Sequence, residues 1–445
     1  MKINKFLFNM LITLCLFGNA SPEGIDASKA VTPIETTKAT PASWTFLVYI
    51  AADNSLADYA AYNMNDMSAG LASLNGVNVL VQWDKPADNK AWRYKITPGG
   101  KIDAGTFSSE MGYNPATELV NSMQWAITNY PAKKYALVLW DHGSGIEDFY
   151  PATARTIINN AMHPSLPDRG ILYDDSQGTC LTNPGLTNAL GIIKKMLGKK
   201  LDLIAMDACL MAMVEVGYQM KDLVNIFVGS QETIPGEGYP YSQFLRPLSL
   251  NPATTSPLIL AKNMVTAYSK FYTQQMPTSD FTLSAIDVTS INLIKQNIDQ
   301  FITAVAACKK INAASTKSII LAARKASISF AMPEYIDLYS FYANVLNQIK
   351  KISPKSLLIL EKRHKTIKAV PSKAFKKTLD ALSVVVLNGL NKITKIVLTK
   401  AAGPVYSGTK GISIYYPSDG NIDSSYPQTL FAQNTAWMQF IQTYH

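Results

Sequence analysis

Two short segments of the sequence hold residue types that can carry out nucleophilic catalysis. One is the run DHGSG at residues 141–145, and the other is the run DAC at residues 207–209. A cysteine thiol attacks a carbonyl carbon when a base within hydrogen-bonding reach takes its proton, and the resulting oxyanion needs N–H donors. His142 can be the base and Cys209 the nucleophile. The backbone N–H groups of Gly143 and Cys209 can be the donors, because a glycine lets the backbone approach a substrate closely.

The cysteine count also points to a reactive thiol. The chain has four cysteines and no CxxC pair, which excludes a disulfide scaffold and a cysteine-rich zinc module. Removal of an N-terminal signal peptide would leave Cys180, Cys209 and Cys308, and an odd number leaves at least one thiol unpaired. We interpret Cys180 and Cys308 as structural. The other three histidines have no partners at ligand spacing, so we assign no metal ligands.

The N-terminus has the pattern of a secretory signal peptide. Two lysines precede a short apolar run at residues 6–17, and small residues follow, which predicts cleavage after Ala20. A lipid anchor at Cys15 is the less favoured alternative, because Leu14 is bulky. Residues 21–43 have the composition of a linker. No run of 18 apolar residues occurs, so we predict no transmembrane segment and expect export to the periplasm, the cell surface or the medium.

Apolar strands alternate with helical patterns along residues 44–290. The predicted strands are 44–50, 77–83, 135–140, 201–206 and 224–230, and the predicted helices include 115–130, 183–198 and 211–220. This alternation predicts a parallel sheet covered on both faces, with functional groups at the carboxyl ends of its strands. His142 and Cys209 each follow a strand, so we expect them to meet at one edge. The helix after Cys209 should lower the pKa of its thiol.

The C-terminal region, residues 291–445, is expected to be mostly helical, with a closing strand at 411–417 that returns to the sheet and a last helix at 429–444. Residues 309–400 hold 16 Lys and 2 Arg against four acidic residues, a local charge of +14 in a chain of net charge +9. We interpret these lysines as solvated helix faces, since they alternate with apolar residues. Few aromatic residues are interleaved with them, so we expect no nucleic-acid partner.

At this point the motifs resemble those of a known family. The runs DHGSG at 141–145 and MDACLMAMVEV at 206–216 are similar to the histidine and cysteine motifs of clostripain-like cysteine peptidases (family C11, clan CD). The similarity extends to residues 44–54, 230–239, 335–339 and 411–417, in the family's order. The resemblance implies a caspase-like α/β/α sandwich with a mainly parallel sheet, a His/Cys dyad and cleavage of polypeptides after Arg or Lys.

The resemblance also implies roles for further residues. Asp207 matches the acid that the family places in the pocket for the basic P1 side chain, and a buried carboxylate suits a guanidinium or ammonium group. Ser230, Gln231 and Glu232 would line the substrate strand. No cofactor is required by the sequence. Calcium stimulation is implied by the resemblance alone, and the acidic pair at 174–175 is a weak signal for it.

The long segment after His142 is a candidate for self-processing. It has 58 residues before the strand at Leu201, is rich in proline and glycine, and carries two of the six arginines, Arg155 and Arg169. A peptidase with basic specificity would cut there, and the resemblance points the same way. We predict an exported, monomeric, self-processed endopeptidase. The alternative is an inactive caspase-like module that binds polyanions or an anionic cell surface through residues 309–400.

Overall fold

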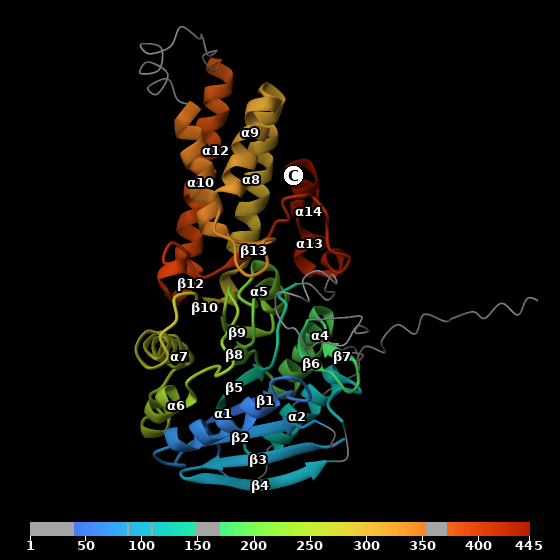
Figure 1. Ribbon diagram of the computed structural model, residues 1–445, viewed down its shortest axis with the longest axis vertical. Helices are drawn as coiled ribbons and strands as arrows, with labels where there is room; N and C mark the ends of the chain where they lie inside the picture. Colours follow the sequence, from blue (N-terminus) through green and yellow to red (C-terminus); the bar gives the residue numbers. More distant parts are fainter. Residues whose placement is uncertain (1–39, 87–88, 108–109, 147–169, 353–371) are drawn as a thin grey trace, which may run out of the picture.

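The structure of the chain is a computed structural model that describes residues 40–86, 89–107, 110–146, 170–352 and 372–445 (Figure 1). The predicted signal peptide, most of the predicted linker and both predicted self-cleavage residues, Arg155 and Arg169, lie outside the described residues. None of the helices in the described ranges has the length and apolar character needed to cross a membrane.

A nine-stranded sheet forms the centre of the molecule. In spatial order its strands are β12 (Val397–Ala402), β10 (Thr282–Asp287), β9 (Val224–Gly229), β8 (Leu201–Asp207), β5 (Ala132–Trp140), β1 (Ala42–Ile50), β2 (Val77–Asp84), β3 (Ala91–Thr97) and β4 (Gly100–Phe107). The five strands from β9 to β2 are parallel to one another, and the antiparallel pairs lie toward the two edges. The predicted parallel sheet is thus confirmed, because its strands are the continuous apolar runs of the sequence.

Helices cover both faces of this sheet. One face carries α1 (Ala57–Gly70), α6 (Tyr241–Leu250) and α7 (Pro257–Lys270), and the other carries α2 (Pro115–Asn129), α4 (Asn183–Leu197) and α5 (Val214–Met220). Alternate residues of β1 show the division, since Phe46 and Val48 belong to the first core and Leu47 and Tyr49 to the second. The α/β/α sandwich is confirmed.

Four long helices form an arm that extends beyond the sheet (Figure 1). The helical arm consists of α8 (Asn292–Ile311), α9 (Ala313–Lys325), α10 (Leu338–Ile352) and α12 (Lys373–Ile396). In α12 the side chains of Leu382, Val386 and Ile393 are buried, whereas Lys373 and Lys376 are exposed. The lysines therefore lie on solvated faces. The arm and the sandwich share one continuous apolar core, so the predicted division at residue 290 does not separate two cores.

The prediction for the closing strand is wrong. The segment forms β13 (Ser413–Tyr415), which pairs with β11 (Tyr335–Asp337) in a separate two-stranded sheet. The N–H of Gly411 donates to the side-chain oxygen of Gln231 at 3.0 Å. The N–H of Ser413 donates to a carbonyl of the loop after β8 at 2.9 Å. These bonds hold the segment across the end of the sheet. The edge position is taken by β12, which follows α12 directly and was not predicted.

Smaller elements complete the chain. An unpredicted hairpin of β6 (Ile171–Asp174) and β7 (Thr179–Leu181) follows the undescribed segment. The predicted last helix is divided into α13 (Leu430–Asn434) and α14 (Trp437–Thr443). The hairpin lies close to the carboxyl end of β5, because Gly143 forms an isolated bridge with Ile171. It therefore borders the edge of the sheet where the predicted catalytic residues lie.

Candidate active site

Loops at the carboxyl ends of β1, β5 and β8, together with the loop after β9 and with Ala331, line a cavity of about 440 Å³. The three strands are parallel and adjacent, so their carboxyl ends lie at the same edge of the sheet. The cavity is lined by Leu56, Trp140, Asp141, His142, Asp207, Ala208, Cys209, Thr233, Ile234, Pro235, Gly236, Gly238 and Ala331. The cavity is thus lined by three residues that the sequence indicated as candidates in separate motifs, His142, Cys209 and Asp207.

Gly143 brings the β5 loop against the β8 loop. A Cβ atom at this position would lie 2.6 Å from the carbonyl oxygen of Cys209 and 3.0 Å from Cβ of Ala208. No side chain fits in that space, so a glycine is needed for the two loops to touch. The next residue, Ser144, donates its N–H to the carbonyl of Gly170 at 3.1 Å. The assignment of the Gly143 and Cys209 N–H groups as oxyanion donors stays a prediction.

The imidazole of His142 is held by the loop that follows β1. The hydroxyl of Ser55 lies 3.0 Å from Nε2 of His142. Asn54 donates from its side chain to Oδ1 of Asp141 and to the carbonyl of Tyr173, each at 2.8 Å. The second carboxylate oxygen of Asp141 accepts from the N–H of Tyr173. Asp141 therefore joins the loop after β1 to the hairpin of β6 and β7.

Ser55 and Asn54 are site residues that the sequence did not reveal. Residues 53–55 lie between β1 and α1, and Oδ1 of Asn54 accepts from the N–H of Leu56 at 2.9 Å, a local bond typical of the turn before a helix. The signal that could have found them is their position, since they follow the strand next to the one that ends before His142.

The thiol of Cys209 is half-buried and accepts a hydrogen bond from the N–H of Ile234 at 3.3 Å. Burial, together with the negative charges of Glu232 and Asp207, raises the pKa of Cys209 to about 11, against a lowering by the Ile234 N–H. The prediction of a lowered pKa is wrong, because α5 begins only at Val214. At neutral pH this thiol is therefore protonated until a base takes its proton.

The residue after the thiol has an uncommon backbone conformation. Leu210 has a φ angle of +66°, in the left-handed region that a branched side chain rarely adopts. Its N–H donates to the carbonyl of Glu232 at 3.1 Å. Strained residues of this kind persist where the surrounding structure holds them, and they cluster at functional sites. The turn directs the chain away from the end of β8 and leaves Cys209 at the cavity.

Asp207 is buried, yet one of its carboxylate oxygens has no hydrogen-bond partner among the described residues. The other oxygen, Oδ2, accepts from the N–H of Tyr239 at 3.0 Å and from the hydroxyl of Tyr241 at 2.9 Å. Burial raises the pKa of Asp207 to about 7, against the lowering by these two donors. A Cβ atom at Gly238 would lie 2.8 Å from Oδ2, so a glycine is needed for this loop to pack against the carboxylate.

The side chains of residues 230–232 do not line the cavity. Ser230 bonds to a threonine of β10 at 2.9 Å, and Gln231 donates to Asp337 at 3.1 Å. Glu232 accepts from the N–H of Ala331 at 3.0 Å. All three side chains are buried, and the cavity wall begins at Thr233. They hold neighbouring segments in place, among them the loop whose Ala331 lines the cavity, instead of facing the substrate as we expected.

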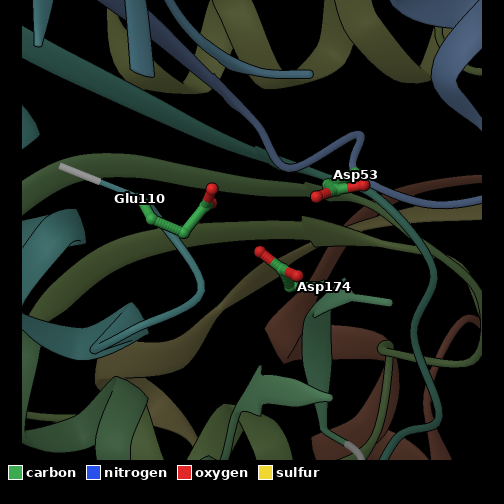
Figure 2. Close-up of side chains that lie close together, drawn as sticks. All are labelled: Asp53, Glu110 and Asp174. Atoms are coloured by element: carbon green, nitrogen blue, oxygen red, sulfur yellow. The ribbon is translucent and has the colours of Figure 1, made fainter. Parts of the chain in front are cut away.

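A cluster of carboxylates lies close to the same edge of the sheet. Asp53, Glu110 and Asp174 come from three separate segments, and each can offer one oxygen such that all three oxygens lie within 4.8 Å of one another (Figure 2). These residues are suited to hold a metal ion. None of them was predicted as a ligand, although Asp174 belongs to the acidic pair noted in the sequence.

Comparison with known proteins agrees with this geometry. The family model described as "Clostripain family" matches residues 48–444. Clostripain of Hathewaya histolytica is 22% identical over 444 residues, covering 86% of this chain and 76% of that protein. The fold resembles that of a secreted C11 cysteine protease from Bacteroides thetaiotaomicron in complex with an irreversible peptide inhibitor (20% identity, TM-score 0.58, covering 89% of this chain and 99% of that one).

A second solved structure is similar to the same extent. An inactive zymogen C11 protease from Parabacteroides distasonis is 18% identical with a TM-score of 0.57, again covering 89% of this chain and 99% of the other. The family match extends from β1 to the end of α14 and includes every segment that lines the cavity. The chain belongs to the clostripain family, and it is a cysteine endopeptidase that acts on polypeptides.

Proposed function

We propose that this endopeptidase cleaves after Arg or Lys with His142 as base and Cys209 as nucleophile, and that it is exported. The observation that carries the proposal is the shared cavity lined by His142, Cys209 and Asp207. Export is supported by the signal-peptide pattern of residues 1–20 and by the secreted relative from Bacteroides thetaiotaomicron.

The dyad works by proton transfer on substrate binding. Since the pKa of Cys209 is raised to about 11, the thiol gives its proton to His142 as it attacks the scissile carbonyl carbon. The hydroxyl of Ser55 binds Nε2 of His142 and orients the ring, so Nδ1 is the nitrogen that takes the proton from the thiol. The N–H groups of Gly143 and Cys209 stabilise the oxyanion. The imidazolium then protonates the leaving amine, and water hydrolyses the thioester.

Asp207 selects the basic side chain. Its Oδ1 has no protein partner among the described residues, and a guanidinium or ammonium group in the cavity would supply one. Without a cationic substrate side chain beside it, the buried carboxyl group of Asp207 is about half protonated at pH 7. A substrate with a neutral P1 residue gains nothing from this carboxylate, which is the physical basis of the preference.

Self-processing is proposed for the segment between Gly145 and Gly170. The relative described as an inactive zymogen supports a cut in this family. Gly170 is buried, its N–H donates to Sγ of Cys180 at 3.2 Å, and its carbonyl accepts from Ser144. A protease needs an accessible backbone, so the Arg169–Gly170 bond is the poorer target and Arg155–Thr156 the preferred one.

The decisive experiment compares fluorogenic peptides that differ only at P1, with Arg, Lys, Ala or Asp. The intact protein should cleave the Arg and Lys peptides at least tenfold faster than the other two, and Cys209→Ala should cleave none. Equal cleavage of the Ala peptide would contradict the role of Asp207. In the described parts of residues 309–400 the lysines lie on solvated helix faces, and nothing there favours the polyanion-binding alternative.

A further inference from the structure

The carboxylate of Glu232 holds two residues that line the cavity. The side chain is buried, with an exposed fraction of 3%. Its Oε1 accepts from the N–H of Thr233 at 2.7 Å, and its Oε2 accepts from the N–H of Ala331 at 3.0 Å. Thr233 belongs to the loop after β9, and Ala331 to the segment between α9 and β11. One carboxylate therefore sets where two distant segments of the cavity wall lie relative to each other.

A tyrosine from a third segment fixes this carboxylate. The hydroxyl of Tyr406 donates to Oε2 of Glu232. Tyr406 ends the short 3₁₀ helix Pro404–Tyr406, which follows β12, and its ring lies against that of Phe330, with the ring centroids 5.2 Å apart. Burial and the neighbouring carboxylate raise the pKa of Tyr406, so the hydroxyl keeps its proton and stays a donor. Tyr406 thus supports both the carboxylate and the segment that contains Ala331.

The backbone of Glu232 supports the turn that carries the nucleophile. Its carbonyl accepts from the N–H of Leu210 at 3.1 Å, and Leu210 is the residue with the left-handed backbone that follows Cys209. Its own N–H donates to the hydroxyls of Ser230 at 3.1 Å and Thr282 at 3.0 Å. Glu232 is therefore anchored to β10 and holds the turn after β8.

The charge of Glu232 also acts on the thiol. Its side chain accepts hydrogen bonds at both oxygens, as an ionised carboxylate does. Burial raises the pKa of Cys209, and among the charged groups that contribute to the rise, Glu232 has the largest effect. The titratable groups around this thiol are Asp141, His142, Asp207, Glu232 and Tyr268. Removal of the Glu232 charge should therefore change the pH at which the thiol ionises.

We propose that Glu232, held in place by Tyr406, is a positioning residue for the reaction at Cys209, an inference that rests on the proposed function. Glu232 does not line the cavity, so it acts through the residues that it binds and does not touch the substrate. The segment after β12 thereby takes part in shaping the cavity. Small displacements of catalytic groups cost rate even when the fold is kept.

The first test measures how readily Cys209 ionises and needs no turnover. Iodoacetamide alkylates the thiolate, so the labelling rate against pH gives the thiol pKa, and mass spectrometry identifies the labelled cysteine. All proteins in this test carry His142→Ala, which removes the imidazole from the titration. Glu232→Gln keeps an acceptor and removes the negative charge, so labelling at pH 8 should be about threefold faster or more. Asp58→Asn, an exposed carboxylate on α1, is the control and should label as its parent does.

The second test measures turnover of the Arg peptide by the full chain with His142 in place. Tyr406→Phe keeps the charge of Glu232 and removes the hydroxyl that orients it, so kcat/KM should fall by about tenfold. The thiol pKa should not fall, and Tm should stay close to that of the parent. Tyr339→Phe, at a half-buried tyrosine of α10 outside the cavity lining, is the matched control and should keep full activity. Glu232→Gln should be more active than Glu232→Ala, which leaves two backbone N–H groups without an acceptor.

A Glu232 that only supports the fold gives a different result, because its variants would lower Tm and leave the thiol pKa unchanged. A thiol pKa in Glu232→Gln equal to that in Asp58→Asn would overturn the proposal. Equal activity of Tyr406→Phe and Tyr339→Phe would overturn it as well. A lowered thiol pKa in Glu232→Gln, in a protein whose parent cleaves no peptide, would support the placement of Glu232 beside Cys209 and count against the proposed function instead.

Discussion

The carboxyl edge of the sheet and the helical arm differ in the kinds of side chain that they bury. At the edge, Asp207 and Asp174 are buried, and each has an oxygen without a hydrogen-bond partner among the described residues; Leu210 has a left-handed backbone. In the arm, Val386 and Ile393 are fully buried while Lys373 and Lys376 are exposed. At the edge, buried polar groups lower the stability of the fold but are available to bind a substrate or an ion. In the arm, apolar side chains are buried and charged ones are exposed, as in ordinary helix packing. Substitutions at the edge should therefore change catalysis, and those in the arm should change stability.

The largest effect is expected at the dyad. Cys209→Ala and His142→Ala should each lower kcat/KM by about 10⁴-fold or more, and the double variant should lose no more than either single variant, because the two residues act as a unit. Thermal unfolding should stay close to that of the parent. Peptide cleavage assays measure the first effect and calorimetry the second. Substantial turnover by correctly folded Cys209→Ala would remove this residue from the mechanism.

The next effect concerns Asp207. Loss of the buried partner of a charge costs about 2–5 kcal/mol, so Asp207→Asn should lower kcat/KM for Arg and Lys peptides by about thirtyfold or more. The burial-raised pKa of about 7 adds a pH dependence. The carboxyl is neutral below pH 7 and ionised above it, so the ratio of parent to variant activity should rise from pH 5 to pH 8. A ratio that stays constant over this range would assign the basic preference to another acid.

A smaller loss is expected at Ser55. Its hydroxyl orients His142 without touching substrate, and misplacement of a catalytic group costs rate even when binding is kept. Ser55→Ala should lower kcat by about tenfold and leave KM unchanged, and the pH profile of kcat should shift because a hydrogen bond to the imidazole is lost. Ser55→Thr keeps the hydroxyl and should restore most of the activity. Failure of the threonine variant to recover would argue for a packing role.

Stability effects should appear in the arm. A Cβ atom at Gly389 in α12 would lie 2.3 Å from the Tyr342 ring and 2.4 Å from Oδ1 of Asn297, so Gly389→Ala should destabilise by about 1–3 kcal/mol. The matched control is Gly191 in α4, which has nothing within 4 Å of that position. Gly191→Ala should stabilise by about 0.5–1 kcal/mol through helix propensity. Denaturant unfolding measures the change in the free energy of unfolding, and its sign, for both variants. Stabilisation by both variants would show that α12 is not held as closely as the structure has it.

The smallest effect is expected from the exposed lysines of the arm. Replacement of Lys373, Lys376 and Lys377 together by Gln should change the free energy of unfolding by less than about 0.5 kcal/mol. The activity of the folded enzyme should be unchanged, because these side chains lie on solvated faces. A marked loss of peptidase activity in this variant would make the basic surface part of substrate recognition.

Local patterns in the sequence were sufficient for much of the fold. The apolar runs that became β1, β5 and β8 could be located to within three residues, because strands buried on both faces contain long apolar runs. Their order along the chain also placed His142 and Cys209 past strand ends. Adjacent parallel strands bring such ends together, so the cavity could be anticipated from spacing alone.

Contacts between distant segments were decided by the tertiary structure. A hydrogen bond from Gly411 to the side chain of Gln231 helps to hold the closing strand away from the central sheet. Helix α5 begins too far along the chain for its N-terminus to lower the pKa of Cys209. Burial, a property of the whole fold, raises the pKa of that thiol instead of lowering it. Asp53, Glu110 and Asp174 are separated by more than fifty residues along the chain. Nothing in their local sequence relates them, and only the folded loops bring their oxygens together, because side chains far apart in sequence meet through packing.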